Sequence, residues 1–146
     1  MAAISYHHTV KDVQGLPWQK PGPFASPEWF ALLEQHGHSP LLALAREGDA
    51  AVCLPLVETG SGLAVLTNWY AFSWAGLHTP AAPPELLDLL ARDLARRTHR
   101  IELSNPKKGM DKYVYTYSDD ELQRRLAELA KKGVRWKDPV QRYKGL

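Results

Sequence analysis

The chain has 146 residues, of which 45% are hydrophobic, and it carries a formal net charge of +2 at pH 7. No apolar run approaches the ~20 residues that a membrane-spanning helix needs, and the single cysteine, Cys53, excludes an internal disulfide. The first ten residues show no basic region followed by an apolar one. We therefore expect no secretory signal, no membrane partner and a cytoplasmic location.

The charge is distributed unevenly along the chain. Residues 1–106 hold 7 Lys and Arg against 10 Asp and Glu, whereas residues 107–146 hold 11 against 6. Such a change of sign is typical of a nucleic-acid-facing segment or of a boundary in composition, and a solvated helix with basic ends would also explain it.

In chain order, the first predicted element is an edge strand over residues 4–10. A helix is predicted over residues 27–36, because Ser26 is a good N-cap and Pro27 suits the first helical position. Gly37 follows at the position where helices end in a left-handed residue.

Three short apolar runs then organise the chain, at residues 41–45, 51–56 and 63–67. Gly, Asp and Glu separate them, a pattern that predicts strands joined by tight turns. Residues 84–98 have the broad apolar face of an amphipathic helix, and residues 100–103 alternate polar and apolar as in a strand. The fold class is therefore α/β (α+β), with a small, mostly antiparallel sheet covered by two or three helices.

Residues 105–109 are the predicted boundary between two segments, 1–106 and 107–146. Beyond it, residues 112–117 alternate like a strand, and a capping box at 118–121 opens a helix that continues to Lys132. A turn and a last short strand, over residues 140–143, complete the expected strand–helix–strand tail.

Few residues form a pattern that indicates chemistry. The chain contains no P-loop, dinucleotide fingerprint or nucleophile elbow, and its carboxylates show no dyad spacing. His36 and His38 form a pair, but a metal site needs three or four ligands and the other histidines lack ligand spacing, so no metal site is predicted. Cys53 lies within an apolar run, so we expect a buried and inert thiol.

The aromatic run at residues 68–74 is the most unusual local feature. One interpretation makes it the wall of a substrate pocket formed by Asn68, Tyr70, Ser73 and Trp74, with the first three as polar contacts. The other interpretation makes it a strand end whose aromatic side chains fill the core beside the helix at 27–36.

Residues 3–104 resemble the N-terminal half of a bacterial acyltransferase of the GNAT superfamily, of the FemAB-like kind related to cellulose biosynthesis. Four sequences carry the resemblance: FASPEWF at residues 24–30, PLLALA at 40–45, LPL at 54–56 and LTNWY at 66–70. It implies a GNAT-type α/β layer and acyl transfer from acetyl-CoA or another acyl-CoA to an amine substrate. The family's pyrophosphate loop, Gln/Arg-x-x-Gly-x-Gly/Ala, has no counterpart in the chain, so the expected acyltransferase is incomplete or inactive and its catalytic residues are unassigned.

Residues 109–146 resemble the TOPRIM-region segment of the B subunit of a type IIA DNA topoisomerase, gyrase B or topoisomerase IV B. The sequences YVYTYSDDEL at 113–122 and VQRYKGL at 140–146 carry this resemblance. It implies DNA and Mg²⁺ as partners of the parent enzyme, with Arg142 and Lys144 as candidate phosphate contacts. The chain therefore looks like a chimera. The third hypothesis is a structural or interaction module without chemistry, which a dimer that buries the run at 69–74 would favour.

Overall fold

The computed structural model of the chain describes residues 2–20, 22–60, 62–67, 73–98, 100–104, 112–116 and 134–135, together with positions 124, 126 and 128. Positions 124, 126 and 128 are helical, as predicted, and Leu126 is buried. The remainder of the helix predicted over residues 118–132 and the strand predicted over 140–143 lie outside the described residues.

The fold is α+β, as the sequence predicts, and is built on one mostly antiparallel sheet. The strand order is β1-β2-β3-β4-β7-β8, and β6 also pairs with β3; the β4–β7 pair alone is parallel among the described pairings of this sheet. The bounds are β1 Ala3–His7, β2 Leu41–Glu47, β3 Ala50–Thr59, β4 Gly62–Val65, β6 Leu77–His78, β7 Arg100–Ser104 and β8 Lys112–Thr116. A second, two-stranded sheet pairs β5 (Ser73–Trp74) with β9 (Val134–Arg135).

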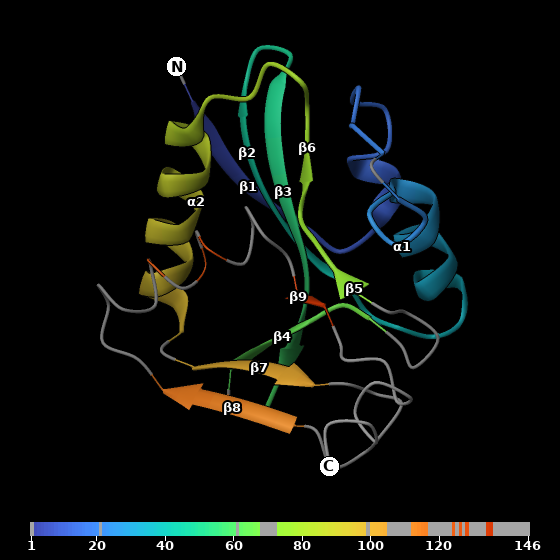
Figure 1. The fold of residues 1–146 in the computed structure, drawn as a ribbon, viewed down its shortest axis with the longest axis vertical. Helices are drawn as coiled ribbons and strands as arrows, with labels where there is room; N and C mark the ends of the chain where they lie inside the picture. The colour runs from blue at the N-terminus through green and yellow to red at the C-terminus, as the bar shows by residue number, and fades with distance from the viewer. Residues whose placement is uncertain are drawn as a thin grey trace, which may run out of the picture.

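The two central strands are covered on both faces. In Figure 1, α2 (Pro84–Arg97) lies on one side of β1, β2 and β3, and α1 (Pro27–Gln35) lies on the other. Consecutive residues therefore face alternate helices, and every side chain from Leu41 to Ala45 and from Ala51 to Leu56 is buried. This explains why β2 and β3 read as continuous apolar runs and not as alternating ones.

Local signals place both helices. The Ser26 hydroxyl accepts a hydrogen bond from the Trp29 N–H at 3.3 Å, which caps α1, and Pro27 occupies the first turn as predicted. Six residues of α2 are buried, four of them leucines, and they pack on the sheet face where β2 carries Ala43 and Ala45. Large side chains of the helix thus meet small side chains of the strand, which permits close approach.

Pro55 explains why the third predicted strand ends early, at Val65 instead of residue 67. Its carbonyl accepts the Leu66 N–H at 3.1 Å, so the N and C=O of Pro55 both face β4. Proline has no N–H to return the second hydrogen bond of that pair, so regular pairing stops there. The chain leaves the sheet at this point and returns as β6, which pairs with the first half of β3 through Val52 and Cys53.

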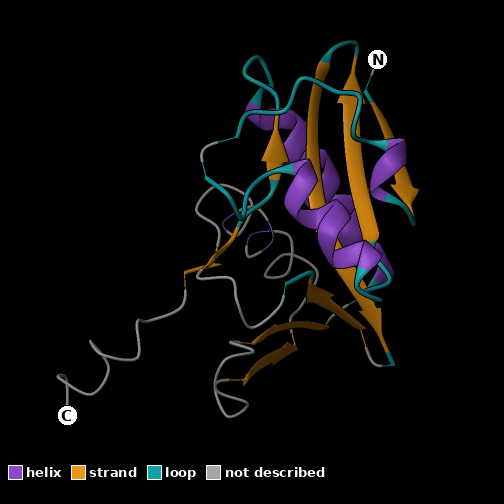
Figure 2. Cartoon of the chain, turned by 90° about the vertical axis from the view of Figure 1, so that its right-hand side faces the viewer, coloured by secondary structure: helices purple, strands orange, loops and turns teal. Residues whose placement is uncertain are grey.

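The strand predicted over residues 112–117 joins the main sheet. It forms β8, which pairs with β7 over five residues, and β7 pairs with β4. Figures 1 and 2 agree that β7 and β8 lie at the end of the long axis away from the N-terminus. Backbone pairing thus continues across the predicted boundary at residue 106. The sequence predicts a turn where β9 lies, and it does not indicate the pairing of β9 with β5, because two-residue strands leave no periodic pattern.

Candidate functional site: a pocket beside the first turn of helix α2

A cavity of about 320 Å³ lies where β6 ends and α2 begins. We call it the α2 pocket. Its walls are Val52, Leu77, His78, Ala82, Pro83, Pro84 and Leu87. Most of this lining is apolar, and its volume is at the lower end of the range of about 300–1,000 Å³ that is usual for small-molecule sites.

Hydrogen bonds of Thr79 hold the loop between β6 and α2 against the start of β3. Its N–H donates to the Ala51 carbonyl at 3.0 Å, and its hydroxyl accepts the Ala51 N–H, also at 3.0 Å. The Thr79 side chain is buried, so these bonds are shielded from water. The Ala82 N–H then donates to the Thr79 carbonyl at 3.2 Å. One wall of the α2 pocket is therefore held rigidly against the sheet.

His78 supplies the ionisable side chain of the pocket lining. Its side chain is exposed, whereas its backbone carbonyl accepts the Gln19 N–H at 2.9 Å. The backbone is therefore fixed while the imidazole remains accessible to a bound molecule. It is the polar group that could orient a ligand in an otherwise apolar site.

The first turn of α2 is poorly suited to hold a phosphate. Helix N-termini bind anions through free backbone N–H groups, but Pro83 and Pro84 have none, and the Leu86 N–H already donates to the Pro83 carbonyl at 3.1 Å. Glu85 adds a negative charge to the same turn. The α2 pocket therefore suits an uncharged, largely apolar group.

Tyr6 attaches α2 to the edge of the sheet. Its hydroxyl donates to Asp93 Oδ2, and the guanidinium of Arg97 lies 3.6 Å from the centre of its ring. Burial, followed by the hydrogen bond to Asp93, raises the pKa of the Tyr6 hydroxyl well above its ordinary range. The phenol stays protonated and continues to donate, so α2 and the pocket wall it carries have a defined position on β1 and β2.

A second cavity, of about 440 Å³, opens at the other end of α2. It is lined by Glu58, Thr59, Gly62, Leu63, Arg97 and Thr98. The positively charged side chain of this lining, Arg97, stacks on the ring of Tyr6, and Glu58 adds a negative charge to the lining. This cavity lies at the negative end of the helix dipole, so it is not arranged to bind an anion.

The residues predicted to bind substrate are not brought together among the described residues. Asn68 and Tyr70 lie outside them, as do Arg142 and Lys144. Ser73 lies in β5, where it pairs with Arg135. Trp74 is 2% exposed, and its indole N–H donates to the Pro55 carbonyl at 2.9 Å. Trp74 thus belongs to the hydrophobic core and fills the space where Pro55 interrupts the pairing.

Reasoning from the sequence did not single out the α2 pocket. Apart from His78, its lining consists of Ala, Val, Leu and Pro residues, which carry no chemical signature, and the Pro-rich connection before the helix is the feature that the sequence shows. The pocket arises because β6 returns to β3 after the interruption at Pro55, and that return is a long-range pairing.

In comparisons with protein families, curated proteins and solved structures, nothing matched this chain. The described residues include no group of three or more His, Cys, Asp or Glu side chains that could hold a metal ion. None of the helices in the described part of the chain is both long and apolar enough to cross a membrane.

Proposed function

We propose that this chain is an acyltransferase-like domain that holds the acyl end of an acyl thioester in the α2 pocket. The observation that carries the proposal is the position of this pocket, at the carboxyl end of β6 and the amino end of α2. In open α/β sheets, where helices connect parallel strands, ligands bind outside the carboxyl ends of the strands. The crossover in this chain runs from β4 through β6 and α2 to the parallel strand β7, and β6 has the direction of β4 because both pair antiparallel with β3.

The order of the elements supports the same proposal. Antiparallel strands β2, β3 and β4 precede the helix and a strand parallel to β4 follows it, which is compatible with the α/β layer that the GNAT resemblance implies. The β4–β7 pairing involves only two residue pairs, Leu63 with Ile101 and Ala64 with Glu102. The two strands therefore share a short parallel contact, and β4 is not paired along its whole length to β7.

The binding free energy of the acyl donor would come from contacts with its acyl and thioester groups. The apolar walls favour burial of an acyl chain by about 0.8 kcal/mol for each methylene removed from water. Because Pro83 and Pro84 carry no N–H and the Leu86 N–H is already hydrogen-bonded, the phosphates of acyl-CoA would gain little from this helix. The expected activity, transfer of the acyl group to an amine, is therefore incomplete in this chain, and no catalytic residue is assigned to it.

Two adjacent alanines in the loop before α2 provide the test. Ala82 lines the pocket, whereas Ala81 is exposed and does not. Binding of octanoyl-pantetheine is measured by calorimetry for the unaltered chain, A82W and A81W. A bulky ring at position 82 should fill the pocket and weaken binding about tenfold or more, which corresponds to about 1.4 kcal/mol, while A81W should bind like the unaltered chain.

Equal binding by A82W and the unaltered chain would contradict the proposed site. Circular dichroism and the thermal midpoint of each variant control for misfolding, because only a folded variant reports on the pocket. An equal loss in A81W would mean that the loop, and not the pocket, is affected.

The alternative reading, a type IIA topoisomerase fragment that binds DNA with Mg²⁺, stays a prediction. Its candidate contacts, Arg142 and Lys144, lie outside the described residues. The homodimeric interaction module also stays a prediction, since most of the run at 69–74 lies outside them too.

A further inference from the structure

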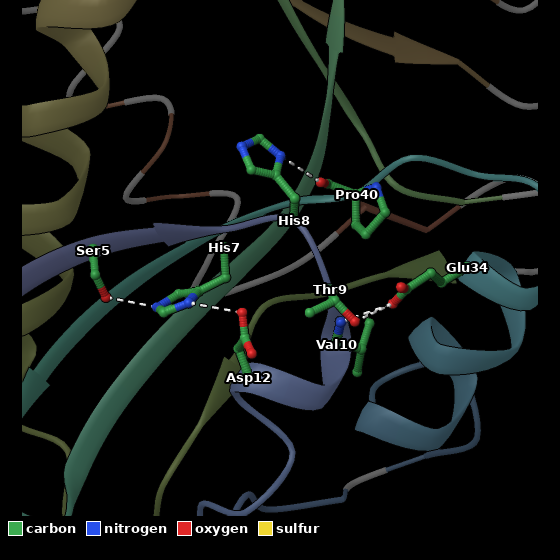
Figure 3. A network of polar contacts seen from close by, with 8 residues as sticks. All are labelled: Ser5, His7, His8, Thr9, Val10, Asp12, Glu34 and Pro40. Carbon is green, nitrogen blue, oxygen red and sulfur yellow. Dashed lines mark hydrogen bonds and ion pairs between the residues drawn. The ribbon is translucent and has the colours of Figure 1, made fainter.

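A second group of polar side chains lies on the opposite face of the sheet from α2, at the junction of β1 with the short 3-10 helix η1 (Val10–Asp12). Figure 3 shows Ser5, His7 and Asp12 connected in a row. Ser5 Oγ lies 2.8 Å from His7 Nε2, and His7 Nδ1 lies 3.4 Å from Asp12 Oδ2. The two ring nitrogens of one imidazole therefore contact a hydroxyl on one side and a carboxylate on the other.

The backbone explains why these three side chains meet. Ser5 and His7 are two apart in a strand, so they project from the same face of β1. The chain then turns into η1, where Val13 N–H donates to the Val10 carbonyl at 3.0 Å, and this turn carries Asp12 back beneath the imidazole.

Helix α1 fixes the turn in position. Glu34 Oε1 accepts the Val10 N–H at 2.8 Å and lies 3.3 Å from the hydroxyl of Thr9. Val10 and Val13 are both 1% exposed, so η1 is anchored in the core at each end. Asp12 is therefore presented from a rigid support, which is the condition for a positioned catalytic group.

The contacts suit one tautomer of His7. With its proton on Nδ1, on the side of the Asp12 carboxylate, the imidazole would keep on Nε2 the lone pair that accepts the Ser5 hydroxyl proton. The same order of hydroxyl, imidazole and carboxylate activates the nucleophile of serine hydrolases. A distance of 3.4 Å between the last two groups is within the looser geometry seen before substrate binds.

The group is also accessible. The side chains of His7 and Asp12 are 25% and 51% exposed, and Ser5 is partly exposed. In the described part of the chain β1 is an edge strand, paired with β2 alone. Alternate backbone N–H groups of an edge strand point away from its partner, which leaves them available as hydrogen-bond donors.

We propose that Ser5 is a nucleophile towards activated carboxylic esters, with His7 as its general base and Asp12 as the positioning residue. Ser5 Oγ forms a bond to the ester carbonyl carbon while its proton passes to His7 Nε2. In the resulting tetrahedral intermediate the bond to the alcohol oxygen breaks, and His7 returns the proton to the departing alcohol. Water then attacks the acyl-serine with His7 again accepting a proton, and the acid and free Ser5 are released.

The test uses a fluorophosphonate probe, which reacts with activated serines, followed by intact-mass measurement and peptide mapping. The probe should label Ser5 once, and S5A should remain unlabelled. H7Q should be labelled at least about a hundredfold more slowly than the unaltered chain, since a general base contributes about that factor or more. H8Q is the matched control, because His8 is the neighbouring residue and its Nδ1 contacts the Pro40 carbonyl at 3.3 Å, outside the row. It should label at a rate within about twofold of the unaltered chain.

Asp12 needs a separate comparison, because a merely structural carboxylate would also affect stability. D12N should slow labelling and 4-nitrophenyl acetate hydrolysis, while D12E, which keeps the charge, should restore part of both rates. The proposal is overturned if the unaltered chain is not labelled at Ser5, if H7Q and H8Q label alike, or if D12N labels at the unaltered rate. Site mapping on the unaltered chain decides the first point even where a variant does not fold.

Discussion

Cys53 lies in the middle of β3 with no exposed surface. Burial raises the pKa of its thiol far above the ordinary value of 9.0, since the thiolate would have to form in an apolar interior. The thiol is therefore inert, as the apolar run around it predicts.

This burial has a consequence for stability at alkaline pH. Above pH 9.0 the unfolded chain loses the thiol proton and the folded chain keeps it, so unfolding releases a proton and the free energy of unfolding falls as pH rises. The stability that this group contributes is complete below the unfolded pKa. Between pH 8 and pH 10 the unaltered chain should lose about 1.4 kcal/mol more than C53A, measured by urea unfolding at each pH. Parallel pH profiles for the two proteins would show that the thiol titrates in the folded state.

The role of Gly48 is conformational. It has φ +61° in the turn between β2 and β3, and Asp49, like every described non-glycine residue, has negative φ. Glycine at the first central position with an ordinary residue at the second is the pattern of a type II′ turn, whose twist suits a hairpin. Arg46 Nε donates to the Gly48 carbonyl at 2.8 Å and holds the turn against the strand.

At the scale of elements, the β2–β3 hairpin depends on this turn. A Cβ at Gly48 or at Gly15 would meet nothing within 4 Å, but only Gly48 has positive φ. G48A should therefore lower the free energy of unfolding by about 1–2 kcal/mol through backbone strain alone. G15A is the control, and it should be neutral or stabilising by about 0.4–1 kcal/mol because it restricts the unfolded chain. Equal effects of the two substitutions in urea unfolding would contradict the assigned turn.

The elements that the sequence predicts are those with local signals. Ser26, Pro27 and Gly37 mark the ends of α1, and Gly37 has φ +97° as its position requires. The apolar runs of β2 and β3 and the leucine face of α2 are equally local. The pairings that escaped prediction are long-range: β4 with β7, β6 with β3, and β5 with β9.

The two candidate sites escaped prediction for related reasons. Ser5 and His7 stand at a visible spacing, but Asp12 contacts His7 across a turn that Glu34 holds from α1, a partner distant in sequence. The α2 pocket depends on Pro55, which ends the pairing of β4, and on Thr79, which fastens the returning chain. Neither the partner of Pro55 nor that of Thr79 is indicated by nearby residues.

At the scale of the whole molecule, one sheet links the segments before and after the predicted boundary at residue 106. Strand β8 lies beyond the predicted boundary, yet it pairs with β7 over five residues. The change of charge near residue 106 is thus not accompanied by an end of the sheet. We expect the two segments to contribute to one folded unit.

We propose that this fold binds an acyl thioester through its acyl end, without a helix N-terminus that holds phosphate. The most direct measurement compares the dissociation constants of octanoyl-pantetheine and octanoyl-CoA by calorimetry at low and moderate salt. The two constants should agree within about threefold at both salt concentrations, because phosphates that make no close contact add little and are screened. Binding of octanoyl-CoA that is tighter by about tenfold and weakens with salt would contradict the claim, as would the absence of saturable binding of either thioester.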